Sequence, residues 1–246
     1  ESKILGIFAT SNEKQTYIMN FLEEKILLDG VIKEGNILKV DSFLNHQIDI
    51  DIMRQMAYEF KRRFRGVEVN KVLTIEASGI AIATLLGNLY DVPVVFAKKN
   101  ETANSTDDKY MSKAYSFTHK KQNNVFISKP YLHATDKVLI VDDFLADGQA
   151  AHALIDLVHQ AGGTVAGIGI AVEKGQQQGG RILREEGYRV ESIAIVDAMD
   201  WRTQTIRFRE QPERKLANTQ LKTDDFVFCN QRTSILSWIT RVIFIS

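Results

Sequence analysis

Residues 138–151 have the sequence Val-Leu-Ile-Val-Asp-Asp-Phe-Leu-Ala-Asp-Gly-Gln-Ala-Ala. Four apolar residues lead into two adjacent acids, Asp142 and Asp143, and small, loop-forming residues follow them. Gly148 permits a tight turn and a close approach of the backbone to a ligand. The pattern after it predicts a helix over about residues 149–161. The stretch is therefore a buried strand, a tight loop and a helix, with two carboxylates where the strand ends.

The start of such a helix is an anion site, because its free backbone N–H groups and the positive end of its dipole both favour a phosphate. Neighbouring residues of a strand point to opposite sides, so Asp142 and Asp143 cannot both face inward. One carboxylate can meet sugar hydroxyls, while the other can hold solvent, a lysine or Mg²⁺ through water. The plain alternative is an acidic strand end before a capped helix, and the loop of small residues argues against it.

The rest of the central sequence repeats this alternation of strand and helix. Short apolar runs predict strands at 71–75, 92–97, 137–141, 165–172 and 189–195, and helical patterns cover 81–89, 149–161 and 179–186. Buried strands separated by helices are typical of an α/β fold with a mainly parallel sheet covered on both faces. Ligands of such sheets bind beyond the carboxyl ends of the strands, which is where the acids of residues 138–151 lie.

Three further segments complete the organisation of the chain. A helix opening at Met19 is expected to bury Phe21, Leu22, Ile26 and Leu28 on one face. The long polar segment 98–124 is typical of a functional lid or an insertion, with a hairpin around residues 115–117. We treat 1–18 as an N-terminal extension of unknown role and 19–211 as the main domain. Residues 212–246 are a C-terminal extension, for which an extra helix and a non-native or disordered tail both stay open.

Composition excludes several classes of protein. The chain has 31 basic and 31 acidic residues and a formal net charge of zero. It therefore has no overall positive charge to attract nucleic acid or an anionic membrane. Its single cysteine, Cys229, excludes an intramolecular disulfide and a cysteine-rich zinc site. No apolar run reaches the length of a membrane span. We expect a cytoplasmic protein with no nucleic-acid or membrane partner.

Residues 138–151 resemble the phosphoribosyl-pyrophosphate signature of the type I phosphoribosyltransferases. The wider chain, from about residue 19 to 211, resembles the bacterial xanthine phosphoribosyltransferases of that family. The matching stretches keep one order along the chain: 38–47, 74–80, 93–98, 115–118, 138–151, 167–174 and 187–192. The two acids alone would indicate only the superfamily, whereas the first stretch and the Gln-Ala-Ala after Gly148 are specific to the xanthine branch.

The resemblance implies the type I phosphoribosyltransferase fold, a twisted and mainly parallel sheet flanked by helices, with a small N-terminal hood at about 19–50. It also implies a homodimer that converts xanthine and 5-phosphoribosyl 1-pyrophosphate (PRPP) to XMP and pyrophosphate in purine salvage. Mg²⁺ would be bound with the pyrophosphate, and no direct protein ligand of the metal is assigned. Bond breaking at ribose C1 develops oxocarbenium character and a highly charged leaving group, which the metal and backbone amides would stabilise.

Site roles follow from the resemblance, residue by residue. The catalytic acids facing the ribose would be Asp142 and Asp143. The residues holding the 5′-phosphate would be Ala146, Asp147, Gly148, Gln149 and Ala150. Xanthine would be bound by Leu38 and Asn45 of the hood and by Lys174, whose ammonium suits a purine carbonyl.

The pyrophosphate would lie at the loop 76–80, where Ser78 and Gly79 offer backbone amides, and at Lys98. A helix N-cap accounts for Ser78 equally well. The neighbouring pair Lys98 and Lys99 either contacts pyrophosphate, in its own or an adjacent subunit, or is simply solvated.

His152 and His159 lie two helical turns apart, too far to share a metal, and are interpreted as surface or packing residues.

Three positions depart from related enzymes. Asp147 replaces the usual Asn and should repel a bound phosphate, although its turn should persist. Ile82 stands where Pro usually follows Ile-Ala. Hypoxanthine-guanine enzymes have an acid at the position of Ala146, so we expect poor activity with hypoxanthine. Alternatives are a preference for guanine or adenine, a non-catalytic purine regulator that senses PRPP, and an enzyme inactivated by its two extensions.

Overall fold

The structure is a computed structural model that describes residues 19–99, 108–116 and 121–211. Met19–Arg209 form one compact unit. The expected extensions, 1–18 and 212–246, lie outside the described residues, and so do 117–120 of the expected hairpin.

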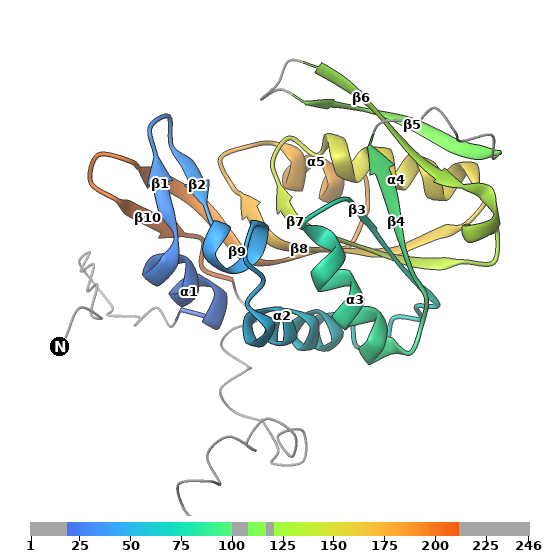
Figure 1. Ribbon diagram of the computed structural model, residues 1–246, viewed down its shortest axis with the longest axis horizontal. Coiled ribbons are helices and arrows are strands. Elements are labelled where there is room, and N and C mark those ends of the chain that lie inside the picture. Colours follow the sequence, from blue (N-terminus) through green and yellow to red (C-terminus); the bar gives the residue numbers. More distant parts are fainter. Residues whose placement is uncertain (1–18, 100–107, 117–120, 212–246) are drawn as a thin grey trace, which may run out of the picture. The chain divides into compact units, whose positions relative to one another are not determined.

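An eight-stranded sheet runs through this unit in the order β10-β9-β8-β7-β3-β4-β6-β5 (Figure 1). Its five central strands are parallel neighbours, and the remaining pairings are antiparallel. The parallel strands are β3 (Lys71–Ile75), β4 (Val94–Lys99), β7 (Lys137–Leu145), β8 (Thr164–Lys174) and β9 (Val190–Asp200). The antiparallel strands are β5 (Lys109–Ser116), β6 (Lys121–Ser128) and β10 (Thr205–Phe208). The expected mainly parallel α/β sheet is confirmed, and so is a hairpin in the polar segment.

Helices cover both faces of the sheet, and the buried residues of β7 alternate between them. Leu139 and Val141 belong to the core shared with α2 (Ile50–Arg63) and α3 (Gly79–Tyr90). Val138 and Ile140 belong to the core on the opposite face, which is formed with α4 (Gln149–Gln160) and α5 (Gly179–Glu185). Figure 1 shows these two pairs of helices on opposite sides of the strands. A strand buried on both faces explains the unbroken apolar run before Asp142.

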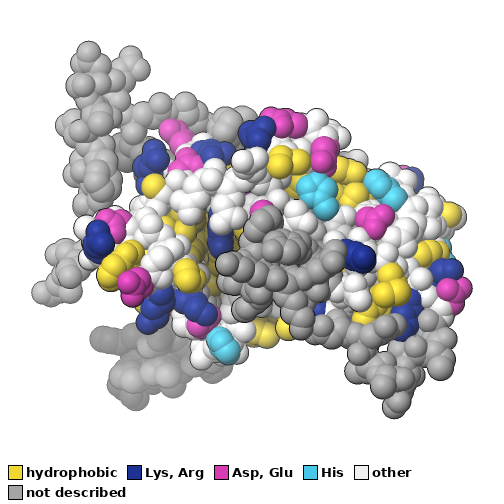
Figure 2. Space-filling model, turned by 90° about the horizontal axis from the view of Figure 1, so that it is seen from above, with side chains coloured by type: hydrophobic (Ala, Val, Ile, Leu, Met, Phe, Trp, Pro, Cys, Tyr) yellow, Lys and Arg dark blue, Asp and Glu magenta, His cyan; other side chains and the backbone are white. Residues whose placement is uncertain are grey.

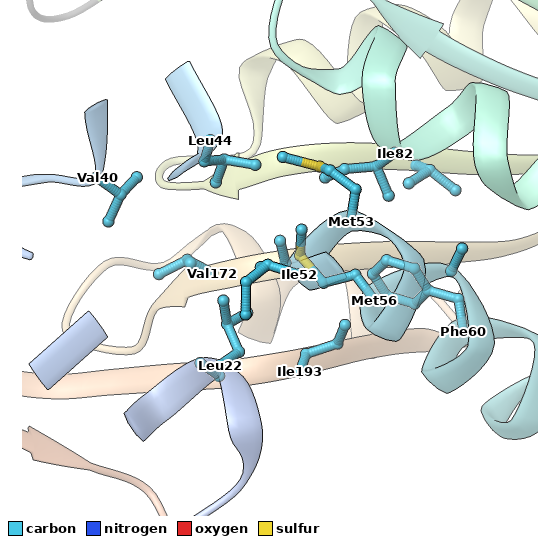
Figure 3. Packing of buried hydrophobic residues seen from close by; sticks show 14 of the residues in the cluster. Leu22, Val40, Leu44, Ile52, Met53, Met56, Phe60, Ile82, Val172 and Ile193 are labelled. Atoms are coloured by element: carbon cyan, nitrogen blue, oxygen red, sulfur yellow. The ribbon is translucent and has the colours of Figure 1, made fainter. Parts of the chain in front are cut away.

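Helix α2 was not predicted from the sequence, yet its side chains fill much of the core that it shares with α3 and β7. Phe60 and Phe64 pack onto strand β8 at two glycines, where an added Cβ would lie 2.9 Å from Phe60 at Gly169 and 2.4 Å from Phe64 at Gly167. Ile82 of α3, the departure noted above, is fully buried. Figure 3 shows it in the same packed layer as Met53 of α2, so this isoleucine contributes core volume.

The expected hood consists of α1 (Phe21–Asp29), a hairpin of β1 (Val31–Lys33) and β2 (Ile37–Lys39), and a π-helical turn at Asp41–Asn45. Leu22 and Ile26 are buried as expected, but Leu28 is 68% exposed, so its place on the buried face was wrong. The side chain of Gln204, between β9 and β10, bonds both the N–H and the carbonyl of Ile32. The turn between β9 and β10 therefore fixes the hood hairpin through this side chain.

Charged side chains of both signs are interspersed over the face drawn in Figure 2, in keeping with the zero formal net charge. A short 3₁₀ turn at Lys129–Tyr131 joins β6 to the segment before β7. Within the described ranges, no helix is long and apolar enough to cross a membrane.

Candidate active site

The acid pair lies inside β7, because this strand continues to Leu145 rather than ending at residue 141. Asp142 is only 8% exposed, whereas Asp143 is half-buried, which confirms that the two side chains point to different environments. The backbone N–H of Asp143 donates to Oδ1 of Asp142 at 2.9 Å. Burial raises the pKa of Asp142 well above its usual value, and the nearby charge of Asp143 raises it further. A carboxyl in this position favours its neutral form.

The loop after β7 turns sharply into α4. Gly148 has φ +89°, so the expected glycine turn is confirmed. The Asp147 side chain turns toward the helix, where its Oδ1 accepts the N–H of Gln149 at 3.2 Å. The carboxylate thus occupies one of the amides that an incoming phosphate would use.

A glycine that the sequence patterns did not single out packs against this loop. The N–H of Gly179, the first residue of α5, donates to the carbonyl of Ala146 at 3.1 Å. A Cβ at Gly179 would lie 2.5 Å from the backbone nitrogen of Gly148. Only glycine fits at this contact, so the start of α5 is built to support the loop at 146–148.

His152 also contacts the loop. One of its ring nitrogens, Nδ1, lies 2.9 Å from the carbonyl oxygen of Gly148, and the other, Nε2, lies 2.9 Å from a carboxylate oxygen of Glu186. His159, two turns further along α4, is exposed. In the described part of the chain, no group of three or more His, Cys, Asp or Glu residues is arranged to hold a metal ion.

Asn45 joins the hood to the acid pair. Its side-chain amide donates to Oδ2 of Asp143 at 3.1 Å and approaches the Ser78 hydroxyl at 3.4 Å. Three of the expected site residues, which are far apart in the sequence, therefore meet at one point. The buried Phe43 and Leu44 anchor the turn that carries Asn45.

The loop before α3 places Ser78 and Gly79 beside β7. Ser78 occupies the N-cap position of α3, as the N-cap interpretation expected, but its side chain makes no capping hydrogen bond. A Cβ at Gly79 would lie 2.0 Å from Thr74 Oγ1 and 3.1 Å from Asp142 Oδ1. The missing side chain lets this loop approach the acid pair. The Glu76–Ala77 peptide bond in the same loop is cis.

The remaining expected residues lie at different distances from the acids. The Lys174 ammonium is 5.9 Å from the ring centroid of Phe144, which follows Asp143 directly. Leu38 is buried in the core on strand β2, with 7% exposure. Lys98 and Lys99 are exposed on β4, and the N–H of Lys99 donates to a carboxylate oxygen of Glu76 at 2.6 Å. The structure thus brings Lys174 close to the acid strand and leaves Lys98 in solvent.

Two polar groupings fix the backbone on either side of Lys174. The buried Glu173 accepts two hydrogen bonds from Arg184 of α5, at 2.9 and 2.7 Å, and a third from Ser192. Burial raises the pKa of Glu173, but the bonds from Arg184 and Ser192 outweigh it, so the net shift is downward. On the other side, Arg209 pairs with Asp197 at 2.6 Å and reaches the carbonyl of Gly175. Neither grouping was expected from sequence.

With this geometry in place, the relatives of the chain can be compared. The family described as "Phosphoribosyl transferase domain" matches residues 39–211. The chain belongs to the phosphoribosyltransferase family. "Xanthine phosphoribosyltransferase 2" of Clostridium botulinum is 54% identical over 183 residues, which are 74% of this chain and 96% of the relative. "Xanthine phosphoribosyltransferase" of Bifidobacterium adolescentis is 53% identical over 192 residues, 78% of this chain and all of the relative.

The resemblance of this phosphoribosyltransferase to the bacterial xanthine branch is therefore confirmed. Solved structures agree on the fold. An adenine phosphoribosyltransferase from Rhodothermus marinus superposes with a TM-score of 0.58 and 22% identity, over 71% of this chain and 97% of that one. One from Trypanosoma brucei, solved with AMP, pyrophosphate and ribose-5-phosphate, has a TM-score of 0.59 and 14% identity, over 71% of this chain and 78% of that one. The expected type I phosphoribosyltransferase fold is confirmed by both.

Proposed function

We propose that this chain transfers the phosphoribosyl group of PRPP to xanthine and releases XMP and pyrophosphate. The observation that carries the proposal is the tight loop between the acid strand β7 and α4, which presents backbone amides next to two carboxylates. The choice of xanthine rests on the relatives that carry that name and align over nearly their whole length.

The phosphate end of PRPP would bind at the start of α4. The loop at residues 146–150 leads into the N-terminus of α4, where backbone amides lack helical acceptors and the helix dipole adds to the attraction for a phosphate. The Gly179 contact keeps this loop in one conformation before the substrate arrives. A site held in advance loses less entropy on binding.

The sugar would lie over the acid pair. Asp143 is half-exposed, so its carboxylate is available to the ribose hydroxyls, while the buried Asp142 shapes the floor through its bond to the Asp143 backbone. In the reaction the C1–O bond to pyrophosphate breaks, a purine nitrogen forms the new bond to C1, and the proton of that nitrogen passes to water. Ala146 offers no base for this proton, which suits xanthine because it is more acidic than hypoxanthine.

The base would lie between the hood and the end of β8. Asn45 already touches Asp143, so a purine bound beside Asn45 would have its reacting nitrogen near the sugar. Lys174 projects from the end of β8 over Phe144, and its ammonium would donate to a purine carbonyl. Leu38 is buried in the hood, so we propose a packing role for it under the base.

The residues present fit Mg²⁺ that arrives with the substrate. Magnesium commonly uses one or two carboxylates together with substrate phosphates, and Asp143 offers such a carboxylate through water. When bound, the ion would neutralise charge on the departing pyrophosphate. Ser78, Gly79 and Lys98 would face the same leaving group. We further propose that the chain forms a homodimer in the cytoplasm and acts in purine salvage. It would have no nucleic-acid or membrane partner.

A base panel tests the function. The full-length chain is assayed with PRPP, Mg²⁺ and each of xanthine, guanine, hypoxanthine and adenine, with product nucleotides separated by chromatography. We expect the highest kcat/KM with xanthine and a much lower one with hypoxanthine. Lys174→Met should raise the KM for xanthine about tenfold or more, as loss of a hydrogen bond to a charged group does. Lys113→Met, at an exposed position on β5, serves as the control. Equal rates with hypoxanthine and xanthine would contradict the base assignment.

A further inference from the structure

The side chain of His152 links two elements at the phosphate loop. Its Nδ1 lies 2.9 Å from the carbonyl oxygen of Gly148, in the loop itself. Its Nε2 lies 2.9 Å from Glu186, which directly follows α5. The ring is about one-third exposed, with a side-chain exposure of 35%.

Both ring nitrogens face oxygen acceptors, a carbonyl on one side and a carboxylate on the other. A ring nitrogen that carries hydrogen donates to the acceptor it faces. The ring therefore bridges the loop and the end of α5. This is a specific arrangement, which a packing residue on the helix surface does not require.

The loop is held from a second direction by the same helix. The N–H of Gly179, at the start of α5, donates to the carbonyl of Ala146. Glu186, just after the other end of α5, contacts the ring of His152. A Cβ at Gly148 would lie 3.2 Å from the Cα of Gly179 and 3.3 Å from the His152 ring. Loop, ring and helix are therefore in mutual contact around Gly148.

Resting on the function proposed above, we propose that His152 is a positioning residue for PRPP. The Gly148 carbonyl also accepts the backbone N–H of His152 at 2.9 Å, so the ring adds a second contact to the same oxygen. The ring thereby fixes the peptide that joins Gly148 to Gln149 at the start of α4, where the 5′-phosphate would bind. The base-binding residues Asn45 and Lys174 lie on other elements, so the effect of His152 falls on PRPP and not on the purine.

Three variants separate this role from simple packing. His152→Ala removes both contacts, and we expect the KM for PRPP to rise about fivefold, the effect of one net hydrogen bond, with the KM for xanthine unchanged. His152→Asn places an amide nitrogen near the position of Nδ1 and should restore most of the PRPP affinity. Glu186→Ala frees the outer end of the ring and should give an intermediate KM. His159→Ala, at an exposed histidine of the same helix, is the matched control.

The measurements are initial rates over both substrates and the melting temperature of each variant. An unchanged KM for PRPP in His152→Ala overturns the proposal. So does an equal rise in both KM values, or a loss in His152→Asn as large as in His152→Ala, since these mark a merely structural role. If His152→Ala does not fold, the Asn and Glu186 variants carry the test. A wild-type chain without phosphoribosyl transfer would instead refute the proposed function itself.

Discussion

The side-chain amide of Asn45 lies 3.1 Å from the carboxylate of Asp143. The first residue belongs to the hood and the second to the central strand β7, 98 positions later in the chain. The same amide approaches Ser78, from the loop before α3. A single side chain thus sets the distance between the proposed base, sugar and pyrophosphate regions.

Replacement of Asn45 should affect catalysis in a charge-dependent way. Asn45→Ala removes a hydrogen bond to a carboxylate, worth about 1.5–3 kcal/mol, so kcat/KM should fall at least tenfold. Asn45→Asp puts a second carboxylate against Asp143, and the repulsion of about 1 kcal/mol or more should lower kcat/KM further. Asn88→Asp, at an exposed position of α3, is the control. Equal activity of the Ala and Asp variants would contradict the proposed contact.

Asp142 is predicted to be a source of instability in the free protein. The fold raises the pKa of Asp142, so ionisation of this carboxyl costs more in the folded than in the unfolded protein. The stability of the wild type therefore falls as the pH rises from the unfolded pKa through the folded pKa. Asp142→Asn cannot ionise and can still accept the Asp143 N–H. We expect it to melt about 2–4 °C higher above neutral pH, the shift for about 1 kcal/mol in a domain this size, with activity greatly reduced.

The pH dependence provides the check on this prediction. Below the unfolded pKa of an aspartate, the difference in melting temperature between wild type and Asp142→Asn should vanish, because Asp142 is then neutral in both states. Asp156→Asn, at an exposed position of α4, should show no such trend. If Asp142→Asn instead melted below the wild type at neutral pH and above, the carboxylate would be stabilised in the fold and the prediction would be wrong.

Asp147 should weaken the binding of PRPP. Its carboxylate accepts the N–H of Gln149, and a phosphate at the same helix end meets a like charge there. Asp147→Asn removes the charge and keeps an oxygen for the same N–H. About 1 kcal/mol of repulsion corresponds to a roughly fivefold lower KM for PRPP in the variant. Steady-state kinetics at low and moderate salt measure it, and an unchanged KM would disprove the electrostatic argument.

Local patterns were sufficient to predict the strand, loop and helix around Asp142, because a buried strand, a glycine turn and a helix start each depend on a few adjacent residues. The contacts that complete the site are of another kind. Gly179 supports the loop although it lies 31 positions after Gly148, and no spacing rule connects the two. Ser78 is the N-cap residue of α3, as the sequence allowed, but its hydroxyl contacts Asn45 of the hood instead of a helix amide. That partner follows from where the hood lies.

The sequence predictions that failed for the helices have related causes. Leu28 continues the apolar pattern of α1, but α1 spans only Phe21–Asp29 and leaves this side chain in solvent. Helix α2 presents methionines and aromatic residues among many charged ones. Its burial depends on the glycines of β8, which make room for Phe60 and Phe64. Such complementarity between two elements is visible only once they are packed together.

The pair of Glu173 and Arg184 should be a major contribution to the stability of the site region. Arg184→Met leaves a carboxylate buried without its main partner, and the free energy of unfolding should fall by about 2–3 kcal/mol, less than for a fully buried pair because Arg184 is partly exposed. In wild type the lowered pKa of Glu173 means that this stability is present above the unfolded pKa and is lost as the pH falls through the folded pKa.

Urea unfolding of a double-mutant cycle distinguishes the pair from its parts. Glu173→Gln together with Arg184→Met should recover part of the stability lost by Arg184→Met alone, because no unpaired charge is then buried. Arg181→Met, which breaks an exposed pair with Glu185 on the same helix, should cost less than about 1 kcal/mol. If the double variant is no more stable than Arg184→Met, the loss comes from packing of the arginine stem. In that case Glu173 does not hold α5, and with it Gly179, against the phosphate loop.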